Sequence, residues 1–89
     1  MKLEELLSNY GGKVPNISWE YGNDAIDGIR NNEKIARAAI DDSIEALQNN
    51  DLDRFYKCQD YFYKVCNNLS GHPWGQSTKT ELEKYRDDG

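Results

Sequence analysis

The strongest constraint on the fold is a helical repeat of apolar residues between positions 55 and 69. Apolar side chains recur there at intervals of three and four, the spacing that places them on one side of an α-helix. Tyr56, Tyr61 and Tyr63 fall on the two borders of this stripe at about 100° per residue. A tyrosine at a border keeps its ring against the core while its hydroxyl reaches solvent or a partner. The pattern predicts an amphipathic helix that presents a surface. The stripe consists of Phe55, Cys58, Phe62, Val65, Cys66 and Leu69.

A second amphipathic helix is predicted over residues 33–48, and only Asn49-Asn50-Asp51 separates it from the first. Asn50 or Asp51 can cap the following helix, which we expect to run to about Asn68. Two helices joined by so short a break must fold back on one another. The sequence therefore predicts an all-α fold, a small helical bundle built on a central antiparallel hairpin of residues 33–48 and 51–68. The predicted core stripe of 33–48 consists of Ile35, Ala36, Ala39, Ile40, Ile44 and Leu47.

Short helices are predicted at both ends of this hairpin. Residues 2–9 carry leucines on one side and end at Gly11-Gly12. Thr78 and Glu81 have the spacing of a capping box, which predicts a short final helix. The secondary structure of two segments is not decided by the sequence. Residues 17–21 form either a strand, as their alternation suggests, or an extended loop. Residues 24–48 form either one helix or two. Both alternatives arise because the run at 17–21 is short and because Gly28 and Asn31-Asn32 weaken the helical pattern.

Length and charge limit the classes of function. The chain of 89 residues is long enough for a single domain, residues 1–89, with one modest core. Its net charge of −5 disfavours nucleic acid and anionic membranes as direct partners and permits proteins with basic surfaces. Arg54, Lys57 and Lys64 do not alter this expectation, because Asp53 and Asp60 alternate with them.

The cysteines and the first residues indicate a cytoplasmic protein. Cys58 and Cys66 are eight positions apart on one predicted helix, about 12 Å, which is beyond the reach of a disulfide. We expect both to be buried thiols in a reducing compartment. Two glutamates interrupt the apolar residues of the first seven positions, so no signal-peptide core is expected, and no segment is apolar enough to cross a membrane.

No pattern for catalysis, metal binding or a cofactor is found in the sequence. The single histidine, His72, would have to reach Cys66 to form a nucleophilic pair, and Cys66 is expected to be buried. The spacing of cysteines and histidine matches no zinc site, and calcium-binding and phosphate-binding loops are absent from the sequence. We therefore expect no enzyme, no catalytic residue, no metal and no cofactor. The alternative is a small enzyme that uses His72 with a nearby carboxylate.

Two groups of residues are candidates for contact with a protein partner. The first is an acidic face around Asp41 and Glu45, which share one side of the predicted helix; the alternative is an ordinary solvated face. The second is formed by the border tyrosines and a tryptophan between glycines, which either plugs the end of the hairpin or anchors a partner. The acidic candidates are Asp41, Asp42 and Glu45, extended by Glu20, Asp24 and Asp27 if the preceding segment packs nearby. The aromatic candidates are Tyr56, Tyr61, Tyr63 and Trp74.

These features favour a non-enzymatic protein–protein interaction module. The interpretation that fits the acidic charge best is a small inhibitor of a nucleic-acid-binding complex, of the anti-CRISPR or anti-restriction type, from a phage or mobile element. The alternative is an immunity protein or antitoxin that caps a basic toxin enzyme. A homodimer through Tyr56 and Tyr63, which lie seven positions apart, is a further alternative.

Overall fold

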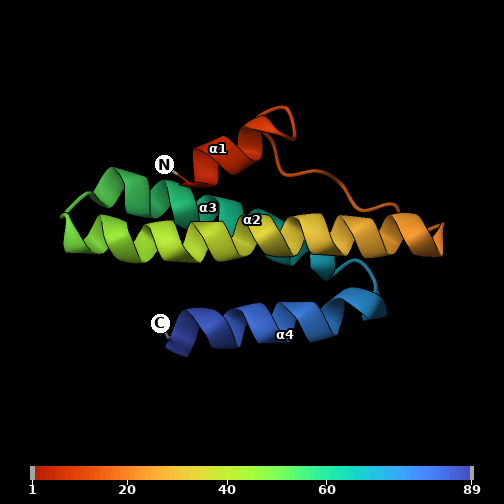
Figure 1. The fold of residues 1–89 in the computed structure, drawn as a ribbon. Coiled ribbons are helices and arrows are strands. Elements are labelled where there is room, and N and C mark those ends of the chain that lie inside the picture. The colour runs from red at the N-terminus through yellow and green to blue at the C-terminus, as the bar shows by residue number, and fades with distance from the viewer. Residues whose placement is uncertain (1, 89) are drawn as a thin grey trace.

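The computed structural model describes residues 2–88, which form four α-helices and contain no strand. The α2–α3 hairpin forms the centre, and α1 and α4 lie on opposite sides of α2 (Figure 1). The Cα atoms span 42 × 28 × 14 Å, so the bundle is flat. The helices are α1 (Lys2–Ser8), α2 (Gly22–Gln48), α3 (Leu52–Leu69) and α4 (Pro73–Asp88). The predicted all-α bundle on an antiparallel hairpin is confirmed.

A single helix, α2, spans the region that the sequence left open as one helix or two. Gly28 is buried against the linker, and a Cβ there would lie 3.1–3.2 Å from Ile17. Asn32 is fully buried, and its Nδ2 donates to the carbonyl oxygens of Gly28 (2.8 Å) and Pro15 (3.1 Å). Its Oδ1 accepts from Asn68 Nδ2 at 3.0 Å. The residues that weaken α2 as an isolated helix therefore hold the extended 13–18 linker against the hairpin.

The hairpin turn is capped as predicted, whereas the start of α2 has no side-chain cap. Asp51 accepts a hydrogen bond from the backbone N–H of Arg54 (3.2 Å), which makes it the N-cap of α3. Asn50 before it has φ 56°, a left-handed conformation that asparagine tolerates. The α2 cap position is occupied by Tyr21, which makes no side-chain cap bond.

The last helix is longer than predicted and begins earlier. It starts at Pro73, five positions before Thr78, because proline is well suited to the first helical position and His72 supplies the cap. Thr78 and Glu81 therefore lie inside α4 and form no capping box. Trp74 lies in the first turn of α4, ahead of the helix start that the Thr78–Glu81 spacing predicted.

All four helices contribute to one core. Most residues of the two predicted stripes belong to this core. Three of them do not: Leu47 is 48% exposed, and Ile44 and Phe55 are only partly buried. The core consists of Leu3, Leu7, Ile35, Ala36, Ala39, Ile40, Cys58, Phe62, Val65, Cys66, Leu69 and Leu82. Among residues 2–88, none of the helices is sufficiently long and apolar to cross a bilayer.

Both cysteines are buried free thiols, and burial raises the pKa of Cys58 and of Cys66. We expect a thiol reagent to modify them at least about 100-fold more slowly in the native protein than in urea, because reaction requires opening of the core. A Ser77→Cys variant provides an exposed control thiol on α4. Equal rates for buried and control thiols would contradict this prediction.

Because the pKa values of Cys58 and Cys66 are raised in the folded protein, we expect the free energy of unfolding to decrease at alkaline pH. The folded-state pKa is the higher one, so the protonated thiols contribute stability that is complete below about pH 8.5 and decreases as the pH rises above it. Urea unfolding of the wild type and of a Cys66→Ala variant across this range measures the contribution. The variant should lose less stability between neutral and alkaline pH than the wild type does.

Candidate functional site

Helix α4 covers only part of the face formed by α2 and α3. Leu82 is fully buried against the hairpin. One turn further on, Tyr85 Oη donates to Asp41 Oδ1 (2.7 Å), which raises the pKa of Tyr85, and Arg86 lies over the ring of Phe62 at 5.0 Å. These contacts place the end of α4 beside Asp41 and Phe62. Beyond them the hairpin continues to its turn at 49–51 without α4 above it.

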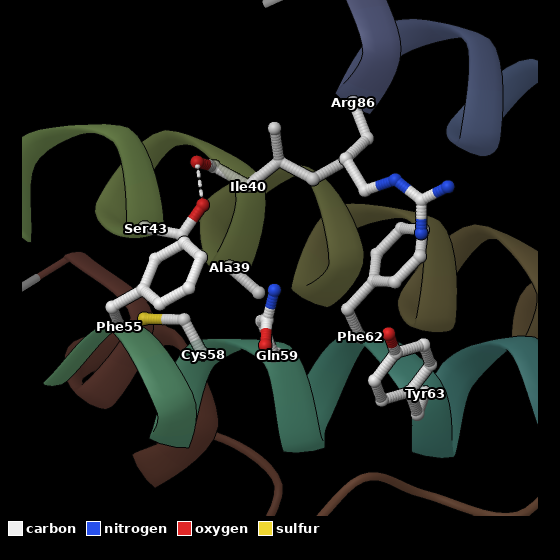
Figure 2. A pocket seen from close by; sticks show the side chains of 9 residues that line it. All are labelled: Ala39, Ile40, Ser43, Phe55, Cys58, Gln59, Phe62, Tyr63 and Arg86. Carbon is white, nitrogen blue, oxygen red and sulfur yellow. Dashed lines mark hydrogen bonds between the residues drawn. The ribbon is translucent and has the colours of Figure 1, made fainter. Parts of the chain in front are cut away.

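The uncovered part of this face forms an apolar groove, which we call the hairpin groove (Figure 2). It holds a pocket of ≈ 60 Å³ that opens to solvent. In Figure 2, Phe62 and Tyr63 of α3 rise beside Arg86 of α4, and Phe55 lies at the opposite end beside Ser43 of α2. The lining residues are Ala39, Ile40, Ser43, Phe55, Cys58, Gln59, Phe62, Tyr63 and Arg86.

Four large apolar side chains around the groove are half exposed. Leu52, Tyr56 and Tyr63 lie at steps of four and seven along α3, and are therefore on one side of this helix. Leu47 lies one turn beyond Ser43 on α2. The exposed fractions are 48% for Leu47, 54% for Leu52, 58% for Tyr56 and 54% for Tyr63. Such a concentration of exposed apolar residues on a small domain is typical of an interaction surface.

Acidic side chains are exposed on both hairpin helices, but they lie outside the lining of the groove. Asp41 and Glu45 are exposed on α2, and Glu45 pairs with Arg54. Asp53 and Asp60 are exposed on α3, about 140–180° round the helix from the groove residues Phe55 and Phe62. Among residues 2–88, the only charged side chain in the groove lining is Arg86.

Arg54, Lys57 and Arg86 are each paired with carboxylates. Arg54 Nη2 lies 3.3 Å from Asp42 Oδ1 and 3.4 Å from Glu45 Oε2. Burial lowers the pKa of Arg54, but the two carboxylates outweigh this effect and raise it. Lys57 Nζ pairs with Glu4 Oε1 at 3.2 Å, and Arg86 lies over Phe62 and pairs with Asp87 (3.2 Å).

The predicted acidic face is not formed as one surface. Asp42 is only 2% exposed, so its place in an exposed face was wrong. The carboxylate instead accepts the backbone N–H of Leu3 (3.0 Å) and pairs with Arg54. Asp24 and Asp27 lie in the first two turns of α2, about 25 Å along the helix from Asp41, and Glu20 lies in the linker before them. These three residues therefore do not extend the surface around Asp41 and Glu45.

The aromatic candidates divide between two sides of the bundle. Tyr56 and Tyr63 border the hairpin groove, as described above. Tyr61 lies on the other border of α3, half buried, with Lys64 Nζ 5.2 Å from its ring centre. It lines a separate hollow together with Lys13 of the linker. Only Tyr56 and Tyr63 therefore share a surface.

His72 and two tryptophans form a cluster at the start of α4. The His72 ring stacks on Trp19, with centroids 5.0 Å apart, and lies 4.5 Å from Trp74. His72 Nδ1 accepts the backbone N–H of Trp74 (3.2 Å) and thereby caps α4. Trp74 stays 56% exposed, so it does not plug the core. The position of His72 is explained by capping and stacking.

Replacing His72 with alanine is expected to lower the free energy of unfolding by about 1–2 kcal/mol, because both the cap and the stacked ring are lost. His72→Asn should recover part of this loss, since asparagine is a good N-cap but lacks the aromatic ring. Urea unfolding followed by tryptophan fluorescence measures both variants. Equal stabilities of the alanine variant and the wild type would contradict the assigned role.

Within residues 2–88, no three His, Cys, Asp or Glu side chains come together in a group that could hold a metal ion. The sequence reasoning missed Leu47, Leu52 and Arg86 as residues of the site. A signal for Leu52 was present: with Tyr56 and Tyr63 it widens the apolar side of α3 beyond the stripe that one neighbouring helix covers. Comparison of the chain with protein-family models, with curated proteins and with solved structures found no match.

Proposed function

We propose that this protein acts without catalysis, by binding another protein through the hairpin groove. The observation that carries the proposal is the group of half-exposed Leu47, Leu52, Tyr56 and Tyr63 on the hairpin, of which Tyr63 lines the pocket. Leaving large apolar side chains in water costs a small domain stability that burial would supply. Tyrosines at the edge of an apolar pocket are typical of the residues that contribute most to protein–protein binding.

The net charge of the chain indicates the class of partner. The whole chain carries a net charge of −5. A partner with a basic surface is therefore favoured by electrostatic steering. Proteins that handle nucleic acid carry such surfaces. We propose accordingly that the protein is a small acidic inhibitor or regulator of a nucleic-acid-binding complex, a class that includes anti-CRISPR and anti-restriction proteins.

The form of inhibition that the geometry supports is steric blocking. Close mimicry of nucleic acid needs a continuous array of negative charges. Here Asp42 is buried, and Asp24 and Asp27 are distant from Asp41. An apolar groove instead favours docking onto a protein surface, with the rest of the bundle obstructing access to it.

Site-specific photocrosslinking tests this proposal. A photoreactive phenylalanine analogue replaces Tyr63 in one variant and Tyr21, 65% exposed at the other end of α2, in a control variant. We expect one protein with a basic nucleic-acid-binding surface to be crosslinked from position 63 and not from position 21. The partner, once purified, should lose nucleic-acid binding when the wild type is added. Equal crosslinking from both positions would contradict the proposal.

The affinity of the purified complex provides a second readout. A Tyr56→Ala/Tyr63→Ala double variant should bind the partner at least about tenfold more weakly, because both side chains lie at the groove. Tyr21→Ala should bind with unchanged affinity. Both tyrosines are half exposed, so circular dichroism should show a retained fold in the double variant.

A further inference from the structure

We infer that a hollow between the linker and α3, which we call the linker hollow, binds the phosphate group of a small phosphomonoester. Its lining includes Lys13 and Asn16 of the linker and Tyr61 and Lys64 of α3. The linker hollow is separate from the hairpin groove, because Tyr61 lies about 160° round α3 from Tyr63. The site is therefore additional to the proposed function.

Two basic groups converge on the linker hollow. Lys13 reaches it from the linker and Lys64 from α3, and within residues 2–88 no carboxylate is part of its lining. Neither lysine forms an ion pair in the described part of the chain, whereas Arg54, Lys57 and Arg86 each pair with a carboxylate. On a chain of net charge −5, these two ammonium groups therefore create a local region of positive potential.

Hydrogen bonds hold the walls of the linker hollow in place. The Nδ2 atoms of Asn32 and Asn68 both donate to the carbonyl oxygen of Pro15, at 3.1 and 3.3 Å, and so hold the linker on α2 and α3. At the edge of the hollow, Gly12 has φ 79°, and its N–H donates to the carbonyl oxygen of Leu7 at 2.8 Å. A site whose walls are already held in place loses less conformational entropy when it binds a ligand.

The donors around the linker hollow suit a phosphomonoester. Lysine binds phosphate as a compact point charge with three N–H donors. A phosphomonoester carries a charge of about −1.5 to −2 at neutral pH, spread over three terminal oxygens, so both lysines can contact it. The Tyr61 hydroxyl and the Asn16 amide can supply further hydrogen bonds, since neither has a partner among the described residues. A carboxylate or a phosphodiester carries a single charge and matches two ammonium groups less well.

The size of the hollow and the charge of the chain favour a small ligand over a nucleic acid. The hollow has a volume of ≈ 310 Å³, many times the roughly 10–15 Å³ that one water needs, so it has room for a phosphate group and a short attached chain. A nucleic-acid strand would bring further phosphates against a chain of net charge −5. The ligand is therefore a small molecule with one terminal phosphate.

NMR titration of the ¹⁵N-labelled chain tests this inference at about pH 7.5, where a phosphomonoester is close to a dianion. The ligands are methyl phosphate, dimethyl phosphate and acetate, compared at equal ionic strength. We expect methyl phosphate to shift the amide signals of Gly12, Lys13 and Lys64 and to leave those of Ser43 and Phe55 in the hairpin groove unchanged. It should bind at least about fivefold more tightly than either of the other anions, and its binding should weaken severalfold between about 50 and 300 mM salt.

Charge-neutralising variants supply the matched control. Lys13→Gln/Lys64→Gln should weaken the binding of methyl phosphate at least about tenfold. Lys34→Gln/Lys84→Gln makes the same change in net charge at two exposed lysines outside the linker hollow and should change the affinity less than about twofold. All four lysines are exposed, so circular dichroism should show a retained fold in both variants. Asp60→Asn should tighten binding, because it removes a carboxylate one turn before Lys64 on α3.

Equal binding of the three anions, equal effects of the two double variants, or unshifted Lys13 and Lys64 signals would overturn the inference. A 5′-phosphorylated oligonucleotide that binds more tightly than methyl phosphate would also overturn it, because the hollow would then belong to a nucleic-acid-binding surface.

The proposed function is tested separately. Lys13→Gln/Lys64→Gln should still bind the protein partner, and Tyr56→Ala/Tyr63→Ala should still bind methyl phosphate. If the lysine variant loses the protein partner and the wild type does not bind methyl phosphate, the linker hollow belongs to the protein interface, and only the proposed function stands.

Discussion

Asp42→Ala is expected to lower the free energy of unfolding by about 3 kcal/mol, because the substitution removes one member of a buried ion pair and leaves its partners unpaired. The carboxylate joins three helices. Oδ2 accepts the backbone N–H of Leu3 at the start of α1 (3.0 Å), and Oδ1 pairs with Arg54 Nη2 of α3 (3.3 Å). A negative charge at the N-terminus of α1 also interacts favourably with its dipole.

Removal of this carboxylate leaves Arg54 poorly compensated. Its side chain is 16% exposed, and its Nε is buried without a hydrogen-bond partner among the described residues. The remaining contact is with Glu45, whose side chain is 60% exposed and whose interaction solvent weakens. The loss is large for a domain of this size, because small domains are stable by only about 5–15 kcal/mol in total.

Glu45→Ala is the matched control, since Glu45 pairs with the same arginine from the solvent side. Its expected cost is below about 1 kcal/mol. Urea unfolding followed by circular dichroism measures both variants. Asp42→Asn should fall between them, because an amide oxygen can still accept from Leu3 but carries no charge for Arg54. Equal costs for Asp42→Ala and Glu45→Ala would show that the buried carboxylate has no special role.

Gly75→Ala is the second change with a large expected effect. A Cβ at this position would collide with the carbonyl oxygen of Leu69 and lie 2.9 Å from the Leu69 C and Cα atoms. These are backbone atoms at the end of α3, so no side-chain rotation relieves the contact, and α4 would have to move away from α3. We expect the free energy of unfolding to fall by about 3 kcal/mol or more.

The control for this variant is Gly22→Ala at the start of α2. No atom lies within 4 Å of a Cβ built there, and alanine favours the helix. Its effect should be below about 1 kcal/mol and stabilising. Thermal unfolding compares the two variants, and limited proteolysis reports whether α4 detaches in Gly75→Ala. A stable Gly75→Ala protein with a protected α4 would contradict the close packing of α4 on the end of α3.

The beginning of α4 illustrates a limit of sequence reasoning. Ser70 to Gly75 contains two glycines and a proline, which is the composition of a loop. In the structure Pro73 opens a helix, and Gly75 lies inside it because the backbone of Leu69 leaves no space for a side chain. Gly75 therefore permits close packing between α3 and α4. This contact cannot be read from the sequence near Gly75, where a glycine ordinarily indicates a helix break.

The middle of α2 shows the same effect. Gly28 and Asn32 reduce the intrinsic preference for a helix, so the sequence could not decide between one helix and two. Contacts with the 13–18 linker favour a single helix. Ile17 packs on Gly28, and Asn32 Nδ2 donates to the carbonyl oxygen of Pro15. These contacts compensate the weak propensity and allow α2 to continue.

The sequence by itself determined the helices and their hairpin, because apolar spacing and a three-residue break are local properties. It also placed Tyr56 and Tyr63 at one border of α3, since helical geometry fixes which residues share a side. Only the tertiary structure decided that Asp42 is buried and that Leu47 and Leu52 are exposed. Burial at these positions depends on where α1 begins and where α4 ends over the hairpin, and these are contacts between segments distant in the chain.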